Sequence, residues 1–76
     1  MIKCHLSRLM GERKVRIAAV AKSTGLHRNM LTLLYMETAV RVELDAIDKL
    51  CRHFKVSVGE LFEFIDEPEP ADKLQA

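Results

Sequence analysis

The stretch from Ile17 to Met36 places the strongest constraint on how this chain can fold. It holds two short runs of apolar residues at helical spacing, joined through Gly25. Ala21 stands where two crossing helices would touch, and a larger side chain there would force them apart. Gly25 is expected to adopt a positive φ and so to end the first helix. The stretch therefore predicts two short helices that cross at a tight turn.

Three more helical patterns flank this pair, and together they predict an all-α fold with five helices. The expected helices span about residues 5–14, 17–24, 28–36, 43–54 and 58–65. The fourth is expected to bury an apolar stripe made of Leu44, Ile47, Leu50, Cys51 and Phe54. The fifth begins with Ser57 and Glu60 at capping-box spacing and is expected to bury Val58, Leu61, Phe62 and Ile65. Residues 1–4 are expected to be extended, and a short strand there is one option.

A chain of 76 residues has room for one small domain with a limited core. We expect that domain to cover residues 1–65. The remaining residues, 66–76, are acidic, contain both prolines and show no hydrophobic period, so we expect a disordered tail. No apolar run reaches the length of about 20 residues that a membrane span needs, and the start lacks the apolar core of a signal peptide. These features favour a cytoplasmic protein with no membrane partner.

The net charge of +1 conceals a strong asymmetry along the chain. Residues 1–41 contain eight lysines and arginines and two glutamates, a net charge of +6. Residues 42–76 contain four basic and nine acidic residues, a net charge of −5. A basic half beside an acidic half favours a polyanion-binding face opposite a solvated one. Ordinary surface charge that happens to segregate is the alternative.

Two short helices that cross at a tight turn form a helix-turn-helix, whose second helix can enter the major groove of DNA. Within residues 17–36, Val20, Leu31 and Leu34 are expected to fix the angle between the helices, and Leu26 to plug the turn into the core. Crossed helices with alanine and glycine at these positions also occur in proteins that never bind DNA. The basic N-terminal half favours DNA binding over that alternative.

Three runs of the sequence resemble the XRE family, the Cro/CI-type helix-turn-helix regulators of phages and bacteria. They are Leu6-Ser-Arg-Leu-Met, Val20-Ala-Lys-Ser-Thr-Gly-Leu-His-Arg-Asn and Leu50-Cys-Arg-His-Phe-Lys-Val-Ser-Val-Gly-Glu-Leu-Phe. The resemblance covers residues 4–65 and is greatest to short, single-domain members. It implies a compact five-helix domain of the lambda repressor-like type, dimeric binding to palindromic operators and often repression.

The start of the second helix in the pair carries side chains that can read DNA. Arginine pairs with guanine and asparagine with adenine in a bidentate way, while threonine offers a hydroxyl and a methyl group. The predicted base-contacting residues are Arg28, Asn29, Thr32, His27, Leu33 and Met36. His27 stands at the N-cap, and Leu33 and Met36 suit either thymine methyl groups or a partner interface. The predicted phosphate-contacting residues are Arg16, Lys22, Tyr35 and Arg41.

Metal binding and catalysis find little support in the sequence. Cys4-His5 and Cys51-Arg-His53 offer ligand types for zinc, but structural zinc usually takes paired ligands that converge from one turn. No nucleophile has an evident base, and the sequence has no glycine-rich phosphate loop. We therefore expect reduced cysteines, no metal, no cofactor and no enzymatic activity.

The sequence as a whole predicts a regulator of transcription that binds specific double-stranded DNA as a homodimer and acts as a repressor. The expected dimer surface is the fifth helix, with Phe62, Phe64 and Ile65, or the segment 1–4. The alternative is a protein-interaction module, such as an antitoxin-like partner. In that case the acidic tail would bind a basic protein, and DNA binding would be secondary.

Overall fold

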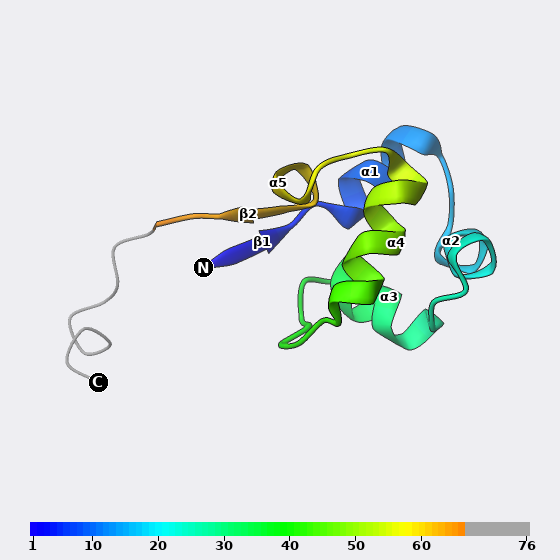
Figure 1. Cartoon of the computed structure of the whole chain (residues 1–76), viewed down its shortest axis with the longest axis horizontal. Helices are drawn as coiled ribbons and strands as arrows, with labels where there is room; N and C mark the ends of the chain where they lie inside the picture. Colours follow the sequence, from blue (N-terminus) through cyan, green and yellow to red (C-terminus); the bar gives the residue numbers. More distant parts are fainter. Residues whose placement is uncertain (67–76) are drawn as a thin grey trace.

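The computed structural model describes residues 1–66, which form a mostly helical fold with one short β-ribbon (Figure 1). The elements follow in the order β1 (Ile2–Cys4), α1 (Leu6–Arg13), α2 (Ile17–Thr24), α3 (Arg28–Tyr35), α4 (Leu44–Phe54), α5 (Val58–Leu61) and β2 (Phe62–Phe64). The first four helices lie within two residues of the bounds expected from apolar spacing. The expected tail lies outside the described residues from position 67 onward.

A single apolar core forms where the helices converge. Its fully buried side chains are Leu6, Val20, Leu31, Leu50, Phe54 and Leu61, which come from all five helices. No polar or charged residue is buried within residues 1–66. Burying each of these apolar side chains contributes about 1.5–3 kcal/mol, so the core fixes how α2 and α3 cross.

A residue with left-handed backbone follows each of the first four helices, and only one of these residues is glycine. Gly25 ends α2 with a φ of 77°, as the sequence predicted. The other residues with a positive φ within the described chain are Lys14 after α1, Glu37 after α3 and Lys55 after α4, with φ of 54°, 58° and 57°. A β-carbon in this region costs about 1–2 kcal/mol, so three helix ends carry a backbone cost.

Side-chain hydrogen bonds stabilise the last two helices, α4 and α5. The predicted capping box of α5 is confirmed: the Glu60 N–H donates to Ser57 Oγ, and the Ser57 N–H donates to Glu60 Oε1 at 2.9 Å. The guanidinium of Arg13 donates to the backbone oxygen of Phe54 and lies over the Phe54 ring, 5.5 Å from its centroid. The end of α4 is thereby fixed to the end of α1.

The expectation of a fifth helix through Ile65 is wrong, because α5 ends at Leu61 and residues 62–64 form a strand. β2 pairs antiparallel with β1, so the extended segment at the N-terminus is confirmed as a strand. Phe62 and Phe64 are separated by one residue, which fits the two-residue period of a strand. The hydrogen bonds to β1 stabilise the strand over a further turn of helix. Val58, expected in the core, is 56% exposed.

The apolar stripe expected on α4 is also shifted. Leu44 is 83% exposed, whereas Ala46 is buried beside Leu50 and Phe54. Leu44 is the first residue of the helix and lies outside the buried stripe, so helical spacing alone assigns it to the wrong side. Ile47 and Cys51 do pack against the core, as expected.

One face of the β1–β2 ribbon is apolar along its whole length. The register places Ile2 opposite Phe64 and Cys4 opposite Phe62, and these four side chains share one face because strand residues alternate. The pair nearer the helices, Cys4 and Phe62, packs on the core. Ile2 and Phe64 are 64% and 66% exposed, and the ribbon extends away from the helices (Figure 1).

None of the helices within residues 1–66 is long and apolar enough to cross a membrane. Over the same residues, no three side chains of histidine, cysteine, aspartate or glutamate come together as metal ligands.

Candidate nucleic-acid interface

The turn between α2 and α3 is held by its own side chains. Thr24 Oγ1 donates to the Val20 carbonyl at 2.7 Å and accepts from the Leu26 N–H at 3.2 Å. Leu26 packs against the core, which confirms its expected role as a plug. His27 is the N-cap of α3 with an extended backbone, and its side chain makes no capping hydrogen bond. The imidazole is exposed at the start of the helix.

The two faces of α3 differ sharply. Leu31 and Leu34 are buried against the core. The opposite side carries the predicted reading residues: Arg28 and Asn29 are exposed, Thr32 is partly exposed, and Leu33 and Met36 are 48% and 64% exposed. The helix is thus anchored by one face and presents the other, with its polar residues in the first turns and its apolar residues in the last.

A shallow groove between the start of α2 and the length of α3 brings together residues that are far apart in the sequence. Arg16, Ala18, Arg28 and Tyr35 line it, with Met10, Val15 and Ile17. Arg16 is the N-cap of α2, and Ala18 lies in the first turn, where backbone N–H groups have no partner within the helix. Two guanidinium groups and a tyrosine beside a helix start form a favourable site for a phosphate.

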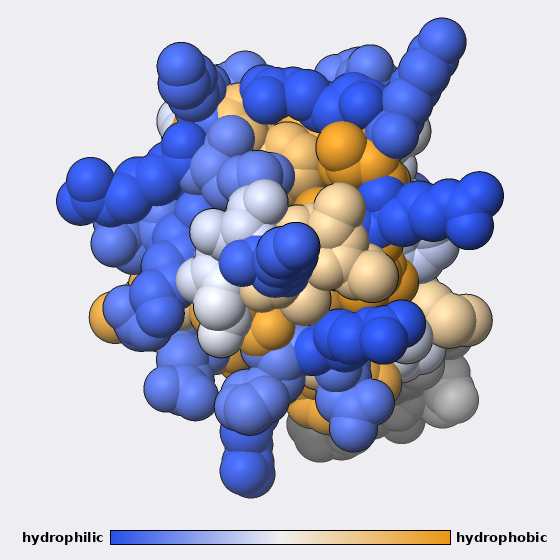
Figure 2. Space-filling model, turned by 90° about the vertical axis from the view of Figure 1, so that its right-hand side faces the viewer, coloured by the Kyte–Doolittle hydropathy of each residue, from blue (hydrophilic) through white to orange (hydrophobic). Residues whose placement is uncertain are grey.

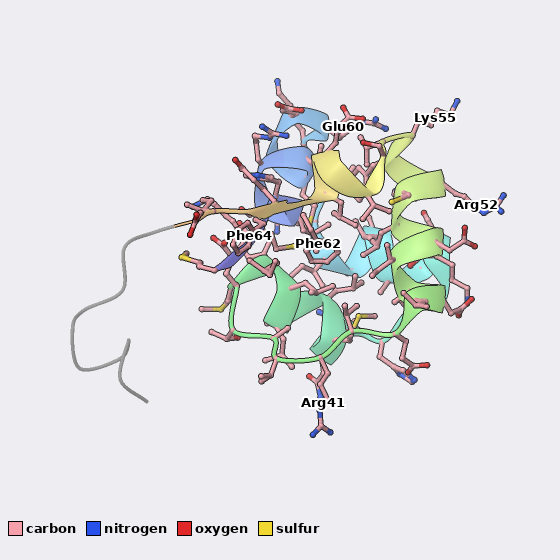
Figure 3. All side chains as sticks on the ribbon, turned by 60° about the vertical axis from the view of Figure 1, so that its left-hand side comes forward. Arg41, Arg52, Lys55, Glu60, Phe62 and Phe64 are labelled. Carbon is pink, nitrogen blue, oxygen red and sulfur yellow. The ribbon has the colours of Figure 1, made fainter. Side chains whose placement is uncertain are left out.

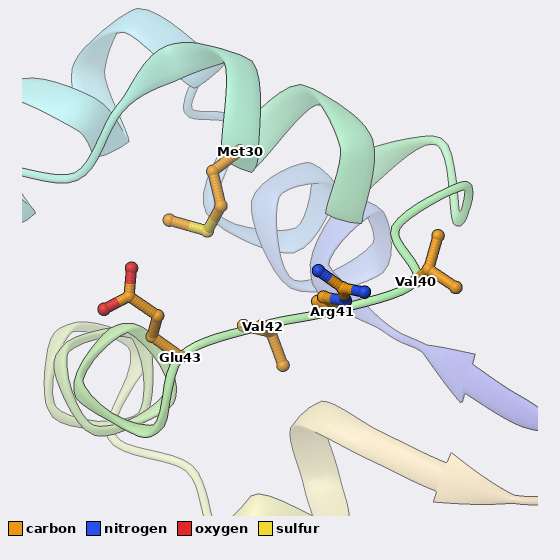
Figure 4. A pocket seen from close by; sticks show the side chains of 5 residues that line it. All are labelled: Met30, Val40, Arg41, Val42 and Glu43. Carbon is orange, nitrogen blue, oxygen red and sulfur yellow. The ribbon is translucent and has the colours of Figure 1, made fainter.

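The loop between α3 and α4 carries Arg41, which projects away from the body of the molecule (Figure 3). Arg41 lines hollows on both sides of this loop, one with Met30, Val42 and Glu43 (Figure 4) and one with Leu33 and Thr38. Val40, its neighbour, is 95% exposed. The loop therefore presents a cation beside the last turns of α3.

The helix pair is free of acidic residues. Between Glu12 and Glu37 the chain contains basic side chains alone among its charged residues, including Lys22 in the last turn of α2. The side of the molecule seen in Figure 2, opposite the ribbon, shows long hydrophilic side chains around a patch of apolar ones. Lys22 is exposed but does not line the groove with Arg16 and Arg28.

Sequence reasoning named the individual candidates but missed two neighbours. Ala18 was not singled out, although a small residue at an exposed helix start lets a phosphate approach the backbone. Val40 was not singled out either, because its position in a loop gave no periodic signal. The grouping of Arg16, Arg28 and Tyr35 depends on how α2 and α3 cross, so spacing in the sequence cannot reveal it.

The cysteines are poor candidates for chemistry. Burial is the main cause that raises the pKa of the Cys4 thiol, and burial followed by Asp48 raises that of Cys51. A thiol that acts as nucleophile or metal ligand needs a lowered pKa instead. Both cysteines are free thiols within the described chain.

The family model of the Cro/C1-type HTH DNA-binding domain matches residues 5–67. No curated protein and no solved structure matches the chain. The matched range contains all five helices and the crossed pair with its exposed α3, and DNA is the partner that this domain implies. The chain therefore belongs to the family of Cro/C1-type helix-turn-helix DNA-binding domains, which bind DNA and are not enzymes.

Proposed function

We propose that this protein is a sequence-specific regulator of transcription that inserts α3 into the major groove of double-stranded DNA in the cytoplasm. The observation that carries this proposal is the exposed polar start of α3 on a helix whose opposite face is buried. An anchored helix holds its side chains in a fixed register against base edges, which specific reading requires. Occupying an operator that overlaps a promoter blocks that promoter, so we propose repression.

The proposed base contacts come from α3 and its N-cap. Arg28 and Asn29 can each form two hydrogen bonds, to guanine and adenine respectively, and Thr32 can reach either type of base edge. The proposed apolar contacts are those of Leu33 and Met36 with thymine methyl groups. His27 stands at the helix start, where it can add a polar contact.

The proposed phosphate contacts surround α3. Arg16 and Tyr35 share a groove with Arg28, so they can hold the phosphate next to the base that Arg28 reads. Arg41 follows α3 and Lys22 lies at the end of α2, which extends the positive surface along the backbone of the duplex. Such contacts fix position and add affinity without reading sequence.

We further propose a homodimer that forms through the β1–β2 ribbon. The apolar face of the ribbon continues past the core, where Ile2 and Phe64 are 64% and 66% exposed among residues 1–66. Two copies related by a twofold axis can cover each other's overhang with the same residues. Such a dimer would present two α3 helices to a palindromic operator, with half-site centres about 34 Å apart.

The experiment that tests this function is selection of bound duplexes from a random DNA pool at near-physiological salt. We expect an enriched palindrome, and Asn29→Ala should then relax the preference at one base position in each half-site, at a cost of about 1–3 kcal/mol. Enrichment of no sequence, with binding that vanishes as salt rises, would contradict the proposal. That result would favour a protein-interaction module such as an antitoxin-like partner.

Removal of residues 66–76 is a second test that distinguishes a DNA-binding regulator from a protein-interaction module. A regulator that reads DNA through α3 should keep its affinity for the selected duplex without this acidic segment. A protein whose main partner binds the segment would lose that partner, which co-purification of a second small protein would reveal.

A further inference from the structure

Glu37 has an unfavourable backbone conformation at the end of α3. Its φ of 58° lies in the left-handed region, where glycine is the usual residue. Its N–H donates to the Leu34 carbonyl at 3.2 Å, and the N–H of Thr38 donates to the Leu33 carbonyl at 2.9 Å. These bonds close the last turn of α3, and a glycine would make them without the cost of a β-carbon. The glutamate side chain therefore needs a separate explanation.

The side chain of Glu37 contacts a segment 33 positions away in the sequence. Its Oε1 accepts a hydrogen bond from the backbone N–H of Cys4 at 3.2 Å. Cys4 is 7% exposed and is the last residue of β1. Because Cys4 is buried, its backbone N–H would be costly to leave without a hydrogen-bond partner. The carboxylate of Glu37 supplies that partner and so stabilises the end of β1.

The geometry of the ribbon explains why this N–H needs an acceptor from outside the sheet. The terminal ammonium group of Met1 and the N–H of His5 donate to the carbonyls of Ile65 and Leu61, on the β2 side of β1. Alternation along an antiparallel strand turns the N–H of Cys4 toward the other edge. That edge faces the end of α3. Among the side-chain hydrogen bonds within residues 1–66, the bond from Cys4 to Glu37 alone joins the ribbon to this region.

We propose that Glu37 is a positioning residue for DNA recognition, because it fixes the orientation of α3 relative to the β1–β2 ribbon. This inference rests on the proposed function, in which α3 reads one half-site and the ribbon joins two copies. In such a dimer the angle between α3 and the ribbon occurs twice, so it sets the distance between the two reading helices. The bond to Cys4 thus limits which half-site spacings the dimer accepts.

Three variants isolate this role. Glu37→Gly removes the acceptor and also removes the backbone cost, while Glu37→Gln keeps an oxygen at the same reach. Both remove the same negative charge beside the DNA-facing helix, so a difference between them is not an effect of charge. Lys55→Gly is the matched control, because Lys55 has nearly the same φ after α4 and none of the hydrogen bonds within residues 1–66 ties its side chain to the ribbon.

The measurement is affinity for the selected palindrome and for versions whose spacer is one base pair shorter or longer. The wild type, Glu37→Gln and Lys55→Gly should prefer the selected spacing by about tenfold or more. Glu37→Gly should lose most of that preference, to about twofold, while its preference for bases within each half-site stays intact. A Glu37→Gly protein that discriminates spacings as sharply as the wild type would overturn the inference.

Amide hydrogen exchange at Cys4 provides a readout that needs no DNA. Exchange should accelerate by about tenfold or more in Glu37→Gly and remain near the wild-type rate in Glu37→Gln and Lys55→Gly. An unchanged rate in Glu37→Gly would overturn the link between α3 and the ribbon. If the wild type itself selected no DNA sequence, both the proposed function and the effect of Glu37 on half-site spacing would be contradicted. The exchange rates would still decide whether Glu37 holds the ribbon to α3.

Discussion

At the scale of single residues, backbone conformation decides what each position tolerates. Gly25 and Gly11 both have open space where a β-carbon would lie. Gly25 has a φ of 77°, whereas Gly11 lies inside α1 with ordinary helical backbone. The two glycines therefore differ in conformation and not in packing.

Alanine at these two glycines should change the free energy of unfolding in opposite directions. Gly25→Ala should lower it by about 1 kcal/mol, because the left-handed region disfavours a β-carbon. Gly11→Ala should raise it by about 0.5–1 kcal/mol, because alanine loses less entropy than glycine in a helix. Urea denaturation of both variants checks the pair, and a loss at both positions would contradict this account.

Arg41 and Arg52 provide a matched test of the phosphate contacts. Both are exposed arginines, and they project from different sides of the molecule (Figure 3). Arg41→Ala should weaken binding to all duplexes and reduce the slope of log affinity against log salt by about 0.9 per contact, hence about 2 for a homodimer. Arg52→Ala removes an ion pair with Asp48 at 3.0 Å on α4 and should leave the slope unchanged. Equal slopes for the two variants would exclude Arg41 from the interface.

At the scale of elements, the short helix α5 depends on its capping box. The backbone N–H of Ser57 is the main cause that lowers the pKa of the Glu60 carboxyl, followed by the Ser57 side chain. A carboxylate whose pKa is lower in the folded than in the unfolded state stabilises the fold above its ordinary pKa. That contribution disappears as the pH falls through the lowered value.

Glu60→Gln should therefore destabilise the protein at pH 7 and have progressively less effect below about pH 4. Ser57→Ala should cost about 1 kcal/mol at pH 7 and keep most of that cost below about pH 4, because the bond from the Glu60 N–H to Ser57 Oγ does not titrate. Thermal unfolding between pH 3 and pH 7 compares the variants with the wild type. A Glu60→Gln effect that stays constant with pH would show that the charge of Glu60 contributes nothing.

The elements also show where sequence reasoning succeeds and where it stops. α2 and α3 were predictable because Val20, Leu31 and Leu34 recur at helical spacing on both sides of Gly25. The strand β2 was not predictable, because it pairs with β1 at the start of the chain, and the spacing of nearby residues carries no information about so distant a partner. In the interface, the exposed polar start of α3 was predictable, since Leu31 and Leu34 define the buried face. The groove that joins Arg16 to Arg28 was not, because it depends on tertiary packing.

At the scale of the whole molecule, the overhanging ribbon predicts the oligomeric state. Phe64→Ser should raise the dissociation constant of the proposed dimer by about tenfold or more, because a large apolar contact is lost. Leu44→Ser is the control: Leu44 is more exposed than Phe64 but belongs to α4, and its replacement should leave the dimer intact. Sedimentation over a range of concentrations distinguishes the two variants. A wild type that stays monomeric while it selects a palindrome would contradict the ribbon dimer.

The left-handed residues Lys14, Glu37 and Lys55 have a consequence for the lifetime of the protein. Compared with glycine at the same three positions, their left-handed backbone lowers the free energy of unfolding by about 3 kcal/mol or more. The whole free energy of unfolding of a typical protein is about 5–15 kcal/mol. A DNA-binding domain built this way spends more time open to cellular proteases than its core alone would allow. In the proposed role as a regulator, its concentration would then fall sooner after synthesis stops than that of a variant with glycine at these three positions.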